Sequence, residues 1–188
     1  LVAQAHEVVI YDDFSRGRRD FVPDDARISF IEGDIRDRAA VERTVTEQGP
    51  ERVVHLAALH FIPDCNARPS DTLEINVGGT QNVLDACARQ RVPRVLYASS
   101  AAVYAPSDAA CRELDSALGP TDVYGRSKLQ GEELARKYHA DTGLDVSMMR
   151  IFNAIGPRET NPHVLPHVLE SLRSSDTIAL GNTEAKRD

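Results

Sequence analysis

Short apolar runs that alternate with longer amphipathic stretches restrict this chain to few folds. Five runs rich in β-branched residues are apolar on both faces, which is typical of strands buried inside a parallel sheet. These runs occupy residues 6–11, 27–32, 52–57, 94–99 and 144–150. Helical stretches lie between them, at residues 37–48, 70–90 and 121–143. The alternation predicts an α/β fold with a doubly wound parallel sheet.

The two longer helical stretches carry the usual signals of amphipathic helices. One face of the stretch 70–90 is expected to consist of Leu73, Val77, Thr80, Leu84 and Cys87, which recur at three- or four-residue spacing. In the stretch 121–143, either Thr121 or Asp122 can cap the first turn, and Gly143 can end the helix.

The composition changes after Arg150. A stretch rich in Pro, Gly and Asn follows, then a predicted helix at residues 167–175 and a predicted short strand at 177–182. We therefore expect one domain over residues 1–150 and the beginning of a second region over residues 151–188.

Charge and composition exclude several classes of protein. The net charge of −7 argues against a nucleic-acid partner. No apolar run approaches the roughly 20 residues that a membrane span needs, and no leader pattern begins the chain. The three widely spaced cysteines, Cys65, Cys87 and Cys111, suit neither a disulfide framework nor a metal site. We expect reduced thiols, no bound metal and a cytoplasmic location.

One pair of side chains suggests proton chemistry. Tyr124 and Lys128 are four residues apart in a predicted helix, which makes them neighbours on one face, about 6 Å apart at Cβ. A free tyrosine has a pKa near 10, and a nearby cation lowers that pKa because it favours the phenolate. Such a phenol can take a proton from a hydroxyl or return one to a carbonyl oxygen. The alternative is a packed tyrosine beside a surface lysine.

Other polar or small residues come where predicted strands end. Ser99 and Ser100 end one strand, and residues 53–58 end another with small side chains against which a flat ring could lie. Asp12 ends a third strand, at a position suited to the ribose hydroxyls of a dinucleotide. Because the strands are parallel, these residues are expected at one end of the sheet, where ligands bind in such folds.

Taken together, these motifs resemble the extended short-chain dehydrogenase/reductases, in the group of NAD-dependent sugar-nucleotide epimerases and dehydratases. The resemblance covers essentially the whole chain. It is carried by YDDFSRG (11–17), GDIRD (33–37), HLAA (55–58), INVGGTQNVLDAC (75–87), SSAAVY (99–104), YGRSK (124–128), RIFNAIGP (150–157) and KRD (186–188). The motifs are most similar to those of UDP-glucose 4-epimerases.

The resemblance implies roles for individual residues. It implies that Tyr124 is the catalytic acid/base, with Lys128 as its partner and Ser100 as the substrate-facing hydroxyl. Cofactor contacts are implied for Asp12, Asp34, Ile35, Leu56, Ala57, Ala58, Asn76, Ser99, Tyr124, Lys128, Ile151 and Phe152. Substrate contacts are implied for Ser100, Asn153, His163, Val164 and Arg187. A carboxylate at Asp12 favours NAD over NADP, although Arg16 and Arg18 lie close in sequence.

Two residues bear on the reaction. Relatives that dehydrate sugars carry an Asp-Glu pair after the active-site hydroxyl, and decarboxylating relatives carry a Glu there, whereas this chain has Ala101 and Ala102. Methyl groups cannot move protons, so the pattern favours epimerisation of a nucleotide sugar, such as UDP-glucose and UDP-galactose at C4, through a transient 4-keto intermediate. The alternatives are a related NAD(P)-dependent reductase or dehydrogenase, and a non-catalytic fragment that binds a partner.

The ends of the sequence differ from the family pattern. No GxxGxxG motif is present, although a Rossmann-type domain binds the pyrophosphate with a Gly-rich turn after its first strand. We therefore expect an incomplete enzyme that lacks this strand and most of the substrate-binding region. The resemblance further implies a homodimer formed through the helices at 70–90 and 121–143.

Overall fold

The computed structural model describes residues 1–156, 158–159, 163–175 and 177–178. Contacts divide the chain into two units, Leu1–Ile151 and Phe152–Asp188. The predicted strand at 177–182 lies partly outside the described residues, and the predicted substrate residue Arg187 lies wholly outside them. Each unit is considered by itself.

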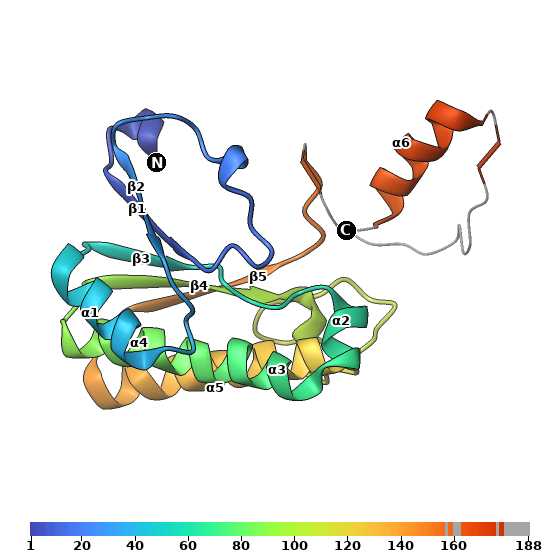
Figure 1. Ribbon diagram of the computed structural model, residues 1–188. Helices are drawn as coiled ribbons and strands as arrows, with labels where there is room; N and C mark the ends of the chain where they lie inside the picture. The colour runs from blue at the N-terminus through green and yellow to red at the C-terminus, as the bar shows by residue number, and fades with distance from the viewer. Residues whose placement is uncertain (157, 160–162, 176, 179–188) are drawn as a thin grey trace. The chain divides into compact units, whose positions relative to one another are not determined.

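The first unit contains five parallel strands in two separate sheets (Figure 1). Strand β1 (Val8–Asp12) pairs with β2 (Ile28–Glu32), and β4 (Arg94–Ser100) lies between β3 (Arg52–His55) and β5 (Val146–Ile151). Within the described residues, β1 and β3 each pair with one strand only. The prediction that a further strand completes this sheet stays a prediction.

The helices of the first unit are α1 (Arg38–Gln48), α2 (Ile62–Ala67), α3 (Pro69–Leu73), α4 (Thr80–Arg89) and α5 (Val123–Thr142). Helix α4 packs between α1 and α5, and these three helices lie on one face of the three-stranded sheet (Figure 1). Short 3₁₀ turns lie at Val2–Gln4, Arg19–Phe21 and Ala101–Val103. The last of these turns, η4, leads directly out of β4. In the second unit, α6 spans Val164–Ser174.

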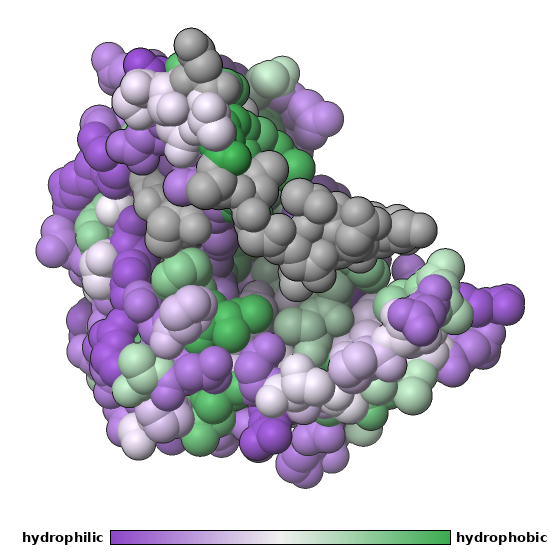
Figure 2. Space-filling view, turned by 90° about the vertical axis from the view of Figure 1, so that its right-hand side faces the viewer, coloured by the Kyte–Doolittle hydropathy of each residue, from purple (hydrophilic) through white to green (hydrophobic). Residues whose placement is uncertain are grey.

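The core lies between the sheet and these helices. Its fully buried members include Leu84 and Cys87 of α4 and Val95 of β4. On the opposite face of the sheet, Val54 and Met149 are 45% and 43% exposed, so the described residues of this unit cover only one face. Apolar surface is also visible at the end of the molecule that Figure 2 turns toward the viewer.

The capping predictions are confirmed at helix α5. The Asp122 side chain accepts a hydrogen bond from the backbone N–H of Gly125 at 2.7 Å, which makes Asp122 rather than Thr121 the N-cap of α5. Gly143 ends the helix in a left-handed conformation with φ of 75°, as a C-terminal glycine commonly does.

The predicted helix 70–90 is correct in extent but wrong in regularity. A π-helical segment, η3 (Glu74–Gly79), separates α3 from α4. The wider turn of a π-helix changes the rotational phase of the residues before it. Leu73, expected on the buried face, is therefore 42% exposed, and Thr72 is fully buried instead. The predicted strand 52–57 ends earlier, at His55, and Leu56 and Ala57 belong to the following loop.

Candidate active site

The N-terminal part of α5 brings Tyr124 and Lys128 together, as their spacing predicted. The Lys128 side chain is buried, and its Nζ atom lies 5.9 Å from the centroid of the Tyr124 ring. The same ammonium donates a hydrogen bond of 2.9 Å to the backbone carbonyl of Ala98 in β4. It also lies 5.3 Å from the centroid of the Tyr97 ring. Lys128 is thus fixed between the helix and the end of the central strand.

The pKa of Tyr124 moves opposite to the sequence-based prediction. Burial raises this pKa, while a hydrogen bond with the Ser100 hydroxyl lowers it and the net direction is upward. Lys128 is not among the groups that shift the pKa of this phenol, and burial lowers the pKa of its own ammonium to about 8. Among the neighbours of Tyr124, the Ser100 hydroxyl is the one that favours the phenolate.

The two serines that end β4 have different partners. The Ser100 hydroxyl accepts a hydrogen bond of 3.2 Å from the backbone N–H of Ala102, and its proximity lowers the pKa of Tyr124. The Ser99 hydroxyl is buried and donates to the carboxylate of Glu132 at 2.6 Å. Only Ser100 therefore presents its hydroxyl to Tyr124, whereas Ser99 connects β4 to the middle of α5.

Asn76 connects three elements from the π-helical segment. Its side-chain oxygen accepts from the backbone N–H of Leu59 at 2.8 Å, and its nitrogen donates to the carbonyl of the same residue at 2.9 Å. The nitrogen also donates to the Ser127 hydroxyl at 2.9 Å, and this hydroxyl donates to the backbone carbonyl of Tyr124. The amide thus fixes the loop after β3 against the first turn of α5. Its predicted contact with the cofactor stays a prediction.

The predicted residues for the adenosine part of a cofactor lie at the ends of β1 and β2. The Asp12 carboxylate accepts a hydrogen bond of 2.7 Å from the backbone N–H of Phe14. The Asp34 carboxylate accepts from the backbone and side chain of Arg36, and Ile35 is buried in the core. After β3, Leu56 is 61% exposed, while Ala57 and Ala58 are half-buried.

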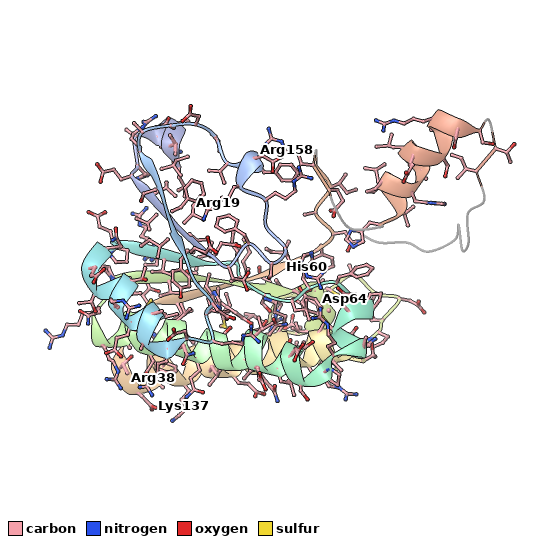
Figure 3. All side chains as sticks on the ribbon, viewed as in Figure 1. Arg19, Arg38, His60, Asp64, Lys137 and Arg158 are labelled. Carbon is pink, nitrogen blue, oxygen red and sulfur yellow. The ribbon has the colours of Figure 1, made fainter. Side chains whose placement is uncertain are left out.

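The two arginines near Asp12 have acidic partners. Arg16 forms an ion pair with Asp64, which Figure 3 labels at helix α2, and Arg18 forms one with Asp20 at 2.6 Å. A 2′-phosphate would therefore have to compete with these carboxylates for either guanidinium. The arrangement is better suited to the free ribose hydroxyls of NAD.

The remaining predicted residues lie at or beyond the boundary between the units. Ile151 ends β5, and Phe152 and Asn153 begin the second unit. His163 and Val164 are the N-cap and first residue of α6. Within the described residues, no group of three His, Cys, Asp or Glu side chains could hold a metal ion. Over that same part of the chain, no helix is long and apolar enough to cross a bilayer.

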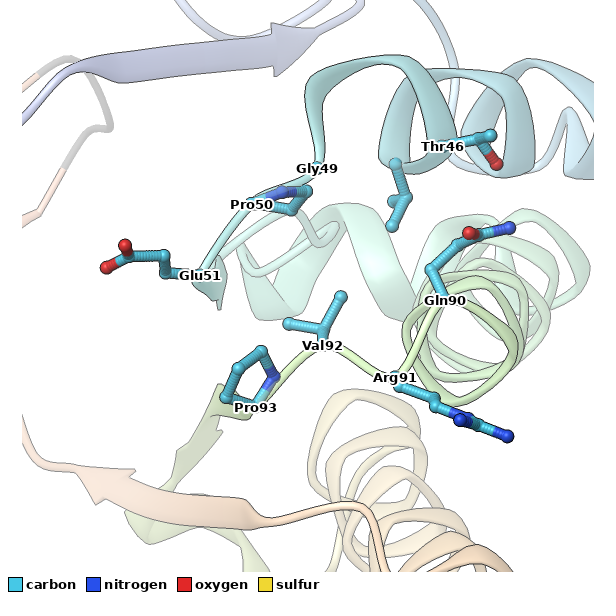
Figure 4. A pocket seen from close by; sticks show the side chains of 9 residues that line it. Thr46, Gly49, Pro50, Glu51, Gln90, Arg91, Val92 and Pro93 are labelled. Carbon is cyan, nitrogen blue, oxygen red and sulfur yellow. The ribbon is translucent and has the colours of Figure 1, made fainter.

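A pocket at the opposite end of the strands has a different character. It lies between the loops that precede β3 and β4 and is lined by residues 45–46, 49–51 and 90–93 (Figure 4). These loops lead into the amino ends of the strands, whereas Ser100 and Tyr124 lie at the carboxyl ends. The pocket therefore has no part in the candidate site.

Sequence reasoning did not single out Glu132 and Arg150. Glu132 is fully buried on α5 and accepts hydrogen bonds from Ser99, Arg150 and Arg136. The available signal was the spacing of Tyr124, Lys128 and Glu132, because residues four apart lie on one face of a helix.

The described residues fit the cofactor that the motifs implied. A carboxylate at the end of β1, a small and partly exposed loop after β3, and an ammonium beneath the end of β4 all lie at carboxyl ends of parallel strands. This is the end at which dinucleotides bind in Rossmann-type folds.

Comparison with known proteins confirms the resemblance. A sequence model of the NAD dependent epimerase/dehydratase family matches residues 1–188, so the chain belongs to this family. A UDP-glucose 4-epimerase from Corynebacterium glutamicum is 35% identical over 177 residues, which cover 90% of this chain and 53% of that protein. The chain spans about half the length of the curated relatives it matches.

Solved structures agree on the fold and on the cofactor. A UDP-glucose 4-epimerase from Brucella ovis in complex with NAD has a TM-score of 0.77 and 34% identity, with coverage of 82% of this chain and 47% of that one. A dTDP-glucose 4,6-dehydratase from Streptomyces venezuelae with NAD bound has a TM-score of 0.84 and 32% identity, with coverage of 92% and 56%. The predicted Rossmann-type fold and the predicted cofactor NAD are confirmed.

Proposed function

We propose that this chain is the NAD-binding part of an enzyme that epimerises a nucleotide-diphosphate sugar, with UDP-glucose and UDP-galactose as the substrates and C4 as the reacting carbon. The observation that carries the proposal is the placement of Tyr124 and Lys128 beside the end of β4, with Lys128 Nζ 5.9 Å from the Tyr124 ring, combined with methyl side chains at Ala101 and Ala102. A broader role in nucleotide-sugar epimerisation or dehydration already follows from the family.

The chemistry assigned to the chain is the movement of one proton. In its ionised form Tyr124 takes the proton of the sugar's 4-hydroxyl, and it returns that proton when the 4-keto sugar is reduced on its other face. Ser100 binds the same sugar oxygen, and Lys128 orients the cofactor's nicotinamide ribose. Bound NAD supplies reversible hydride acceptance, so the cycle produces no net redox change.

The alanines distinguish epimerisation from dehydration. Removal of water needs an acid and a base beside the reacting carbons, and η4, which follows Ser100 directly, offers only methyl groups at these two positions. The relatives include both UDP-glucose 4-epimerases and a dTDP-glucose 4,6-dehydratase from Streptomyces antibioticus, so family membership alone leaves both reactions open. The missing carboxylates favour the first.

The test is an assay of the full-length protein with UDP-galactose. We expect UDP-glucose to form without accumulation of NADH. Stoichiometric NADH would support the alternative, a reductase or dehydrogenase with net redox turnover, and a dehydrated 4-keto sugar would overturn the proposal. UDP-arabinose and UDP-N-acetylglucosamine, assayed in parallel, define the substrate.

The role of Tyr124 has a matched control on the same helix. Tyr124→Phe removes the phenolic oxygen and should lower kcat by at least about 10²-fold while NAD stays bound. Tyr138→Phe removes a phenol that donates to Asp85 at 3.3 Å, about four turns further along α5, and should leave kcat unchanged. Retained turnover in Tyr124→Phe would remove Tyr124 from its assigned role.

The proposal also includes a cytoplasmic homodimer whose subunits meet through the helices of residues 70–90 and 121–143. Helices α4 and α5 pack side by side, so each subunit could contribute two helices to one contact. The molar mass of the full-length protein in solution, measured by light scattering, tests this assembly. A monomer at micromolar concentration would contradict it.

A further inference from the structure

The most heavily bonded carboxylate of the first unit is buried in the middle of α5. Glu132 has a fully buried side chain, and both of its oxygens accept hydrogen bonds. Its Oε1 accepts from Ser99 Oγ at 2.6 Å and from Arg150 Nε at 2.8 Å. Its Oε2 accepts from Arg150 Nη2 at 2.8 Å and from Arg136 Nη2 at 2.9 Å. The Arg150 contact is the two-pronged arrangement that fixes geometry most strongly.

This network keeps Glu132 ionised although it is buried. Burial alone would raise the pKa of the carboxyl group, but the hydrogen bonds from Arg150 and Ser99 outweigh that effect and the pKa is lowered. Removing one partner would leave a buried charge without compensation, which is strongly unfavourable. The pair is therefore held in one arrangement.

Arg150 extends the network to the segment that precedes the catalytic helix. Its side chain is 15% exposed, and its Nη1 donates to the backbone carbonyl of Glu113 at 3.1 Å. Its guanidinium carbon also lies 4.8 Å from the centroid of the Tyr104 ring. Glu113 belongs to the loop 105–119, which leads from η4 to the N-cap of α5.

Backbone contacts close the two ends of the loop 105–119. Ala105 N–H donates to the Ala117 carbonyl at 2.9 Å, and Gly119 N–H donates to the Val103 carbonyl at 3.1 Å. Arg150 holds the middle of the loop from the end of β5. The Glu132 carboxylate thus connects helix α5 to the end of β4, next to Ser100, and to the end of β5. Through Arg150 it is also connected to the loop 105–119.

We propose that Glu132 and Arg150 are positioning residues that fix Ser100 and the loop 105–119 relative to Tyr124 for the reaction. The proposal rests on the proposed function for its effect on turnover. Neither residue is assigned a proton transfer. Their contribution is geometric, and displacement of a catalytic group by about 1 Å can lower turnover by about 10²-fold.

The chain supplies variants that separate positioning from stability. Arg150→Lys keeps the positive charge but cannot bind Glu132 with two parallel hydrogen bonds and reach Glu113 at the same time. Arg136→Gln is the matched control, because Arg136 contacts the same carboxylate but is 48% exposed and, within the described part of the chain, forms no hydrogen bond or ion pair with the loop. In Glu132→Leu/Arg150→Met, apolar side chains replace the charged pair, an exchange that often preserves stability.

The experiment measures kcat, KM and amide hydrogen exchange over residues 105–119 in the full-length protein. In Arg150→Lys and in the double variant we expect kcat to fall by about 10²-fold, KM to change by less than about threefold, and exchange in the loop to accelerate. Arg136→Gln should match the wild type in all three. A folded double variant with wild-type kcat, or Arg150→Lys with unchanged loop exchange, would overturn the proposal.

The two proposals fail in different ways. If the wild type does not turn over UDP-galactose, the proposed function fails, and exchange of the loop 105–119 still decides whether Arg150 holds this segment. If the wild type is active and the variants are as active as the wild type, only the positioning role fails.

Discussion

Replacement of Gly125 by alanine directly tests the geometry of helix α5, which carries the proposed acid/base Tyr124. Gly125 follows Tyr124 in the first turn of α5, where the helix passes close to η4. A Cβ atom built on Gly125 would lie 2.4 Å from the backbone oxygen of Ala102 and 2.9 Å from Cβ of Pro120. Because the nearer atom belongs to the backbone, no side-chain rotation can relieve the overlap.

The size of the effect follows from that distance. Ordinary contact of a Cβ begins at 3.4 Å, so the first turn of α5 and η4 must separate by about 1 Å. Overpacking of this kind costs about 1–3 kcal/mol in stability. The same displacement moves Tyr124 away from Ser100, and a shift of about 1 Å can lower kcat by about 10²-fold.

Gly78→Ala is the matched control. Gly78 also lies within a helical segment, but a Cβ there would meet nothing within 4 Å. Alanine has the higher helix propensity, so this variant should keep full activity and gain up to about 1 kcal/mol in stability. Both variants are compared by urea unfolding and by steady-state epimerase kinetics. If Gly125→Ala has wild-type kcat and stability, the close approach of α5 to η4 does not govern the site.

Two further predictions concern the buried polar groups. The pKa of Lys128 is lowered from 10.5 to about 8, so between these values the unfolded state binds more protons and the contribution of Lys128 to stability rises with pH. Urea unfolding of the wild type and of Lys128→Met measures this contribution as the difference between their free energies of unfolding. The difference should rise by about 1.4 kcal/mol between pH 7 and pH 9, and a constant difference would contradict the lowered pKa of Lys128. Asn76→Ala leaves the backbone N–H of Leu59 without its partner, removes one of the two donors to the Leu59 carbonyl and removes the bond to Ser127, so it should lower the free energy of unfolding by about 3 kcal/mol. Asn82→Ala, which removes an amide from a more exposed site, should cost about 1 kcal/mol by the same measurement, and equal losses would refute the role given to Asn76.

The local rules of helices and strands explain why much of this fold could be predicted from the sequence. Apolar runs of six or seven residues indicated all five parallel strands, and Asp122 and Gly143 indicated both ends of α5. These signals act over a few residues, so no knowledge of tertiary contacts was needed. The same is true of the spacing that placed Tyr124 and Lys128 together.

Tertiary contacts decide the features that were missed. The π-helical segment at Glu74–Gly79 directs Asn76 toward Leu59 and Ser127. No residue type within the segment predicts the π-helical conformation. The pKa of Tyr124 depends on how deeply the phenol is buried, which spacing does not reveal. A helix position alone cannot show that a carboxylate meets an arginine from a strand 18 residues later.

The spacing of charged and phenolic groups along α5 explains how one helix serves both chemistry and structure. Tyr124, Lys128 and Glu132 lie on one face at successive turns, and the last two are almost completely buried. Lys128 contacts the carbonyl of Ala98, and Glu132 contacts the hydroxyl of Ser99. Two consecutive residues of β4 are therefore bonded to two consecutive turns of α5. A one-residue slip of α5 would rotate this face by about 100° and break both contacts. The bonds that hold the helix in register on β4 therefore also fix the position of Tyr124 beside Ser100.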